Sequence, residues 1–167
     1  ELEETDEYIF VLALQNIEFF NAHKYMWEKI GKDFGVKTTI VGPADMDVNQ
    51  TASAIEQAIA KNPKGIITWG FDPGMDSAVN NAIAAGIPVV PIVGDLSSSD
   101  RNTYVGSSQY ELGYIGGEAL ASEINNEGKV AILTLPGVGM FDSREEGFRA
   151  AIDDINSNGG NIEIVAV

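Results

Sequence analysis

The chain has 167 residues, with 10 basic against 25 acidic side chains and a formal net charge of −15. Such a surface repels phosphates, which disfavours a nucleic-acid partner. The absence of cysteine excludes disulfides, thiol catalysis and cysteine-bound metal, and it suits an extracytoplasmic protein. No apolar run approaches the roughly 20 residues that a membrane span needs.

The first two thirds of the chain alternate predicted strands and helices. Strands are expected over residues 8–14, 36–41, 65–69, 89–93 and 103–105, and helices over 19–34, from Asn49 to 61 and from Asp76 to 85. Asn49 and Asp76 are the predicted helix caps, and Ala22, Met26 and Ile30 are the predicted inner face of the first helix. The alternation predicts an α/β fold with a doubly wound parallel sheet.

Residues 64–95 fix where a ligand is expected. They read as strand, loop, helix and strand, so two parallel strands finish at Trp69 and Val93. The following loops, 70–75 and 94–99, emerge at the same edge of the sheet. In open α/β sheets this carboxyl edge is where ligands bind.

The last third supplies two helices and two strands. A helix is expected from Tyr110, with Gly113, Gly116 and Gly117 allowing close packing and an inner face of Leu112, Ile115, Leu120 and Ile124. A strand over 129–135, a capping box opening a helix at Ser143 and a strand over 162–167 follow. Two strands are marginal as an independent sheet. We therefore expect a lobe over 1–108 and the incomplete beginning of a second α/β lobe over 109–167.

Four ordered segments carry a resemblance to a known family. They are YIFVLALQNIEFF, GIPVVPIVGD, YVGSSQYELGYIGGEAL and KVAILTLPGVG followed by SREEGFRAAI. Together they resemble the type I periplasmic sugar-binding proteins of the ribose-binding kind, over nearly the whole chain. The resemblance implies two similar lobes with the ligand held in the cleft between them, and no cofactor. It also implies a periplasmic or cell-surface location, with delivery of a sugar to an ABC permease.

The resemblance implies ligand-binding roles in the first lobe. Phe19 and Phe20 match paired aromatics that face a sugar ring, since aromatic faces suit its C–H groups. Asn16 lies near an amide position, and Trp69 is either core or a wall of the cleft. Asp72 is either a ligand carboxylate or the residue that forms an Asx turn before Pro73 and Gly74.

Two further residues complete the predicted ligand set. Asp95 matches an acidic ligand residue, with a solvated loop carboxylate as the alternative. Arg144 matches an arginine of the second lobe, with a helix-surface cation as the alternative. Four positions depart from the ribose-binding pattern, which leaves the identity of the sugar open; they are Ile17, Glu18, Val93 and Asp142.

Other functions remain as alternatives. A sensor ectodomain binds its ligand in the same way but signals to a membrane partner. A carbohydrate-active enzyme needs paired carboxylates, and nothing in the sequence pairs Asp72 with Asp95. The single histidine, His23, lacks nucleophile partners, and no metal or nucleotide motif is complete. Apolar faces of the second lobe also predict a dimer.

Overall fold

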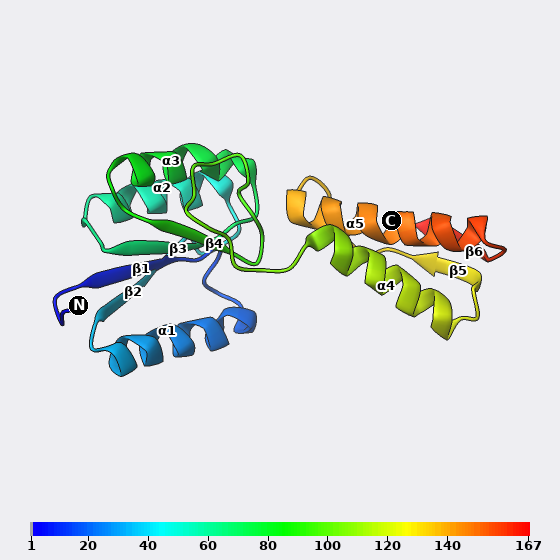
Figure 1. The fold of residues 1–167 in the computed structure, drawn as a ribbon, viewed down its shortest axis with the longest axis horizontal. Coiled ribbons are helices and arrows are strands. Elements are labelled where there is room, and N and C mark those ends of the chain that lie inside the picture. The colour runs from blue at the N-terminus through cyan, green and yellow to red at the C-terminus, as the bar shows by residue number, and fades with distance from the viewer. Residues whose placement is uncertain (1) are drawn as a thin grey trace. The chain divides into compact units, whose positions relative to one another are not determined.

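The computed structural model describes residues 2–167 and divides into two compact units, residues 1–106 (unit 1) and 107–167 (unit 2). Within the described residues, no helix is both long and apolar enough to cross a bilayer. Each unit joins parallel strands to helices, as Figure 1 shows, so the predicted α/β class with a parallel sheet is confirmed.

Unit 1 is built on a four-stranded parallel sheet in the order β2-β1-β3-β4. The strands are β1 (Glu7–Val11), β2 (Lys37–Val41), β3 (Gly65–Trp69) and β4 (Val89–Ile92). Ile9 of β1 pairs with Ile66 of β3, which pairs in turn with Val89 of β4, and all three are buried. Continuous apolar strands of this kind are typical of a sheet covered on both faces.

Helices cover both faces of this sheet: α1 lies on one face, and α2 and α3 lie on the other (Figure 1). Their bounds, with those of two short 3₁₀ turns, are η1 (Glu18–Phe20), α1 (Asn21–Phe34), α2 (Val48–Ile59), η2 (Pro73–Met75) and α3 (Asp76–Ala84).

The predicted inner face of α1 is wrong. Trp27 and Gly31 are its buried residues, whereas Met26 is 49% exposed. The Trp27 ring packs edge-on against Phe10 at 5.7 Å, and its indole N–H donates to the Thr39 carbonyl. The largest side chain therefore decides which face of the helix turns to the sheet.

Both predicted caps are also wrong. Asp47, not Asn49, caps α2 by accepting a hydrogen bond from the Gln50 amide at 2.8 Å. Asp76 is the first residue of α3, whose N-cap is Met75 without a side-chain hydrogen bond, and Asp72 caps the preceding turn η2. The predicted strand over 103–105 is reduced to one bridge, between Val105 and Ile92 of β4.

Unit 2 contains α4 (Gln109–Glu123), β5 (Glu127–Ala131), α5 (Gly139–Ser157) and β6 (Asn161–Ala166). The two strands are parallel neighbours. The core is small: Ala121, Val130, Ile152 and Ile162 are buried, and Leu120, Ile124, Phe148, Ile155 and Ile164 pack against them.

Glycines bring α4 and α5 together. A Cβ added at Gly113 would overlap the Arg144 carbonyl oxygen, and one added at Gly147 would overlap the Tyr110 carbonyl oxygen. The predicted close packing is confirmed at Gly113 and Gly117 and is wrong at Gly116, which faces open space. Because the glycine side of α4 faces α5, two residues of its predicted inner face are exposed instead, Leu112 at 45% and Ile115 at 61%.

The predicted capping box is wrong. Ser143 lies inside α5, which begins four residues earlier at Gly139. Pro136, Gly137 and Gly139 are typical of a loop, but the chain is already helical at Gly139.

Candidate functional site

The candidate site lies in unit 1, at the carboxyl ends of β1 and β3. The chain leaves β1 toward β2 on one side, and the later strands β3 and β4 follow on the other side. The order of the strands therefore reverses between β1 and β3. Such a switch point is where open α/β sheets bind ligands. The loop after β1 carries Asn16, Phe19 and Phe20, and β3 ends at Trp69.

An aromatic cluster fills this edge. Phe20 and Trp69 meet edge-on at 5.1 Å between ring centroids, and Phe19 lies 5.2 Å from Phe20 and 6.2 Å from Trp69. The paired phenylalanines have opposite environments, since Phe20 is 0% exposed and Phe19 is 57% exposed. Phe20 is a core residue of unit 1, whereas Phe19 offers an aromatic face to solvent.

Asn16 lies in the exposed part of the loop after β1. The preceding residue anchors this loop, because Gln15 donates through Nε2 to the Gly42 carbonyl and accepts at its own carbonyl from Lys24 Nζ at 2.7 Å. These two hydrogen bonds fix the position of the backbone just before Asn16.

Asp72 forms the Asx turn that was one of its two predicted roles. Its Oδ1 accepts a hydrogen bond from the Gly74 amide at 2.7 Å and opens the turn η2. The carboxylate is half-buried. The ligand role of Asp72 stays a prediction.

The carboxylate of Asp95 is held by the guanidinium of Arg101. Arg101 donates through both Nε and Nη2 to the two carboxylate oxygens, the second at 2.7 Å. These hydrogen bonds to Arg101 lower the pKa of Asp95, so the carboxylate is ionised at neutral pH. A bidentate pair of this kind fixes the orientation of a carboxylate.

The loops after β3 and β4 lie against each other. The Gly70 amide donates to the Ile92 carbonyl at 3.3 Å, and a Cβ at Gly70 would overlap the Gly94 carbonyl oxygen. Asp76 lies where the two loops meet. Burial raises the pKa of this carboxyl, and the nearby negative charges of Asp72 and Asp95 raise it further. A hydrogen bond from Ser98 has the opposite effect, but the net result is a raised pKa.

Two buried polar atoms at this edge have no hydrogen-bond partner among the described residues. They are the indole nitrogen of Trp69 and Oδ1 of Asp76. Buried polar groups are nearly always paired in native proteins. Trp69 ends β3 and Asp76 begins α3, so the two atoms lie at the two ends of the connection between this strand and this helix.

Arg144 belongs to unit 2 and to a local set of contacts. Its guanidinium donates from Nε to the Gln109 side-chain oxygen at 3.1 Å, with a second bond from Nη2, and lies 5.5 Å from the centroid of the Phe141 ring. The neighbouring carboxylate of Glu145 pairs with Arg149 and not with Arg144. The ligand role of Arg144 stays a prediction.

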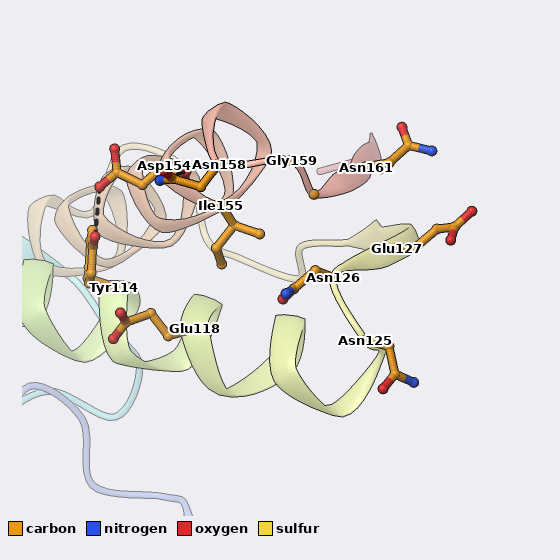
Figure 2. A pocket seen from close by; sticks show the side chains of 11 residues that line it. Tyr114, Glu118, Asn125, Asn126, Glu127, Asp154, Ile155, Asn158, Gly159 and Asn161 are labelled. Carbon is orange, nitrogen blue, oxygen red and sulfur yellow. Dashed lines mark hydrogen bonds between the residues drawn. The ribbon is translucent and has the colours of Figure 1, made fainter.

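Unit 2 also has a polar pocket of about 460 Å³ where α4 and α5 end. Figure 2 shows Tyr114 of α4 and Asp154 of α5 meeting at its margin, with Glu118 one turn further along α4. The Tyr114 hydroxyl donates to Asp154 Oδ2 at 2.7 Å, and this bond raises the pKa of Tyr114 to about 12. None of the predicted ligand residues lines this pocket.

Sequence reasoning missed Arg101, Asp76 and Tyr104 at the candidate site. Arg101 lies six residues after its partner Asp95, in an irregular loop whose path no periodicity specifies. Tyr104 donates its hydroxyl to the Val93 carbonyl at 2.7 Å. A salt bridge within an irregular loop, or a hydroxyl contact of this kind, leaves no sequence pattern.

Comparisons with known proteins agree with the fold. A family model described as a periplasmic binding protein domain matches residues 8–167. The ribose import binding protein RbsB of Bacillus subtilis is 29% identical over 140 residues, which are 83% of this chain and 46% of that protein. The chain thus spans about half the length of this relative.

Solved structures agree as well. GanP, a glucose-galactose binding protein from Geobacillus stearothermophilus, superposes with a TM-score of 0.88 at 26% identity, over 98% of this chain and 58% of that one. A structure of XylFII in complex with LytSN superposes with a TM-score of 0.88 at 25% identity, over 97% of this chain and 59% of that one. The predicted resemblance to periplasmic sugar-binding proteins is confirmed by the family model, by RbsB and by GanP.

Proposed function

The chain belongs to the periplasmic binding protein domain family, and we propose that it binds a sugar outside the cytoplasm and presents it to an ABC transporter. The observation that carries the proposal is the family match over residues 8–167, together with sugar-binding relatives such as GanP. The proposal assigns no chemistry to the protein: the ligand is bound and released unchanged.

The candidate site supports a sugar as the ligand. The exposed ring of Phe19 suits the C–H face of a sugar, and the ionised Asp95 accepts hydrogen bonds from hydroxyls. In this proposal Asn16 and Asp72 add polar contacts from the same edge, Trp69 and Phe20 form the wall behind Phe19, and Arg144 contributes from the second lobe.

The proposed mechanism is a shift in population. A ligand that contacts both lobes favours the state in which both sets of contacts are made. A transporter that recognises this state then distinguishes loaded from empty protein.

A second candidate function has a specific observation in its favour. XylFII superposes well on this chain, and its structure was solved in complex with another protein, LytSN. We therefore keep a receptor that passes its ligand-bound state to a signalling partner as the alternative. The dimer predicted from apolar faces of unit 2 stays a prediction, which light scattering of the chain at high concentration tests.

A thermal-shift screen of the full gene product against D-ribose, D-glucose, D-galactose and arabinose tests the proposal. A sugar at a hundredfold excess over its dissociation constant stabilises the folded state by about 2.7 kcal/mol. We expect one sugar to shift the melting temperature, and the shift to be lost in Phe19→Ala and Asp95→Asn.

Matched controls separate binding from folding. Tyr25→Ala removes an aromatic side chain that is 66% exposed on α1, and Asp100→Asn removes a carboxylate from the loop that holds Asp95. Both should keep the shift. No shift with any of the four sugars, in a protein that melts cooperatively, contradicts the proposed sugar site.

A further inference from the structure

The chain makes a strained turn directly after β4. Val93 has a φ of +68°, in the left-handed region, and the Gly94 amide donates to the Ile92 carbonyl at 2.8 Å across it. A hydrogen bond between residues two apart around a positive φ defines the rare γ-turn. A β-branched residue in this region is a true outlier, and such strain persists only where the surroundings enforce it.

The surroundings of the turn supply that enforcement. The Tyr104 hydroxyl donates to the Val93 carbonyl at 2.7 Å, and the Val93 amide donates to the Val105 carbonyl at 3.1 Å. Both polar groups of the strained residue are thus bound by the segment 104–105. The Tyr104 hydroxyl in turn lies against Gly106, where an added Cβ would overlap it.

The turn sets the direction of the loop that follows. Gly94 and Asp95 come immediately after Val93, and the Gly94 carbonyl lies against Gly70 of the neighbouring loop. An extended residue at 93 would continue β4 and carry Asp95 away from Arg101. The position of the Asp95–Arg101 pair therefore depends on the left-handed turn.

We propose that Tyr104 is a positioning residue for the ligand loop 94–99: its hydroxyl holds the strained turn at Val93, and Gly106 provides the space in which that hydroxyl sits. The role in ligand binding rests on the proposed function, because Asp95 is the loop's expected ligand group. The hold on the turn itself does not depend on a ligand.

The first test needs no ligand. In the 167-residue chain, Tyr104→Phe removes only the hydroxyl, and Gly106→Ala displaces it. Both should speed hydrogen exchange of the Gly94 amide by about tenfold, the effect of losing one hydrogen bond. Amides of β3 should be unaffected. The matched control is Tyr114→Phe, which loses a hydroxyl bond of the same 2.7 Å length in unit 2 and should leave Gly94 unchanged.

A second residue makes the test specific to strain. Asparagine adopts the left-handed region far more readily than valine. In a Val93→Asn background, Tyr104→Phe should therefore change Gly94 exchange by clearly less than it does with Val93 present. Equal effects in both backgrounds, or no effect of Tyr104→Phe and Gly106→Ala on Gly94, would overturn the proposal.

The second test adds the sugar. In the full gene product, Tyr104→Phe should weaken binding of whichever of the four sugars binds by about tenfold, while Tm falls by no more than about 2–4 °C, as for one lost hydrogen bond. Faster Gly94 exchange with unchanged affinity would refute the positioning role. If the wild type binds none of the four sugars, the proposed function fails, and Gly94 exchange alone decides whether Tyr104 holds the turn.

Discussion

The two units use the same kinds of element but are stabilised in different ways. In unit 1, buried strands carry the core, and aromatic and aliphatic side chains of the helices pack onto both faces of the sheet. In unit 2, the closest packing is between two helix backbones, at Gly113 and Gly147, and only four hydrophobic residues form the buried core cluster.

Because of this difference, the two units should be sensitive to different kinds of substitution. The core of unit 1 is built from many large side chains around a sheet. Unit 1 should therefore be destabilised most by substitutions that shorten a buried side chain and leave a cavity. The α4–α5 pair of unit 2 packs through glycines, which have no side chain to shorten. Unit 2 should therefore be destabilised most by a substitution that adds a methyl group at the helix contact.

The largest effect is expected from loss of volume in unit 1. Phe20→Ala removes a ring with 0% exposure and should lower the free energy of unfolding by about 3–5 kcal/mol. Phe19→Ala, one residue earlier and 57% exposed, should lower it by less than about 1 kcal/mol. Urea unfolding monitored by tryptophan fluorescence measures both, because Trp27 and Trp69 are both in unit 1. Equal losses would contradict the different environments of the two rings.

A single added methyl should have the next largest effect, in unit 2. Gly147→Ala should destabilise the α4–α5 pair by about 3 kcal/mol, because its Cβ overlaps a backbone carbonyl that cannot move away. Gly116→Ala, on the open side of α4, should instead stabilise the helix by about 0.5–1 kcal/mol. Thermal melts followed by far-UV circular dichroism measure both variants. Tryptophan fluorescence, which reports on unit 1 alone, shows whether a change in melting is confined to unit 2. Similar melts for both variants would mean that helix propensity, not contact, governs α4 and α5.

Helix caps offer a smaller effect that both units share. Asp47→Ala should cost about 1 kcal/mol, because it leaves the Gln50 amide without its acceptor. Ser108→Ala in unit 2 should cost less, since its bond to the Glu111 amide is longer, at 3.2 Å against 2.8 Å. Urea midpoints of the two variants compare the caps directly, and the reverse ranking would show that cap distance does not decide the energy here.

Acid should have the smallest effect, through Glu7. A hydrogen bond from Thr39 and the nearby Lys37 hold the pKa of Glu7 below its ordinary value of 4.5. The ionised Glu7 therefore contributes fully to the stability of the folded state above pH 4.5. This contribution is lost as the pH falls through the lowered pKa of the folded state. Glu7→Gln should destabilise unit 1 by about 0.5–1 kcal/mol at neutral pH, and this gap should close in acid. Denaturation curves at several pH values test this, and a gap independent of pH would rule it out.

Much of unit 1 was predictable because its strands are continuous apolar runs. The sequence predicts the strands that contain Ile9, Ile66 and Val89, and the loops at their carboxyl ends. Helix faces were less predictable. Trp27 outweighs the regular stripe that includes Met26, and side-chain size at one position is a tertiary property that spacing alone does not express.

The candidate site divides in the same way. Its location follows from strand order, and strand order follows from the alternation of elements in the sequence. Its polar contacts do not, because Arg101 and Tyr104 reach Asp95 and Val93 through irregular backbone. The positive φ of Val93 was unpredictable in principle, since valine is among the residues that most disfavour it.

The neighbouring rings of Phe19 and Phe20 have a consequence for how this protein can change over evolutionary time. One ring is committed to the architecture, whereas the other is open to replacement at little energetic penalty. Under the proposed function, residue 19 is therefore a position where new ligand preferences can arise without a compensating mutation elsewhere. A library randomised at this single codon would sample altered selectivity in proteins that still fold, whereas the same library at residue 20 would mostly sample unfolded ones.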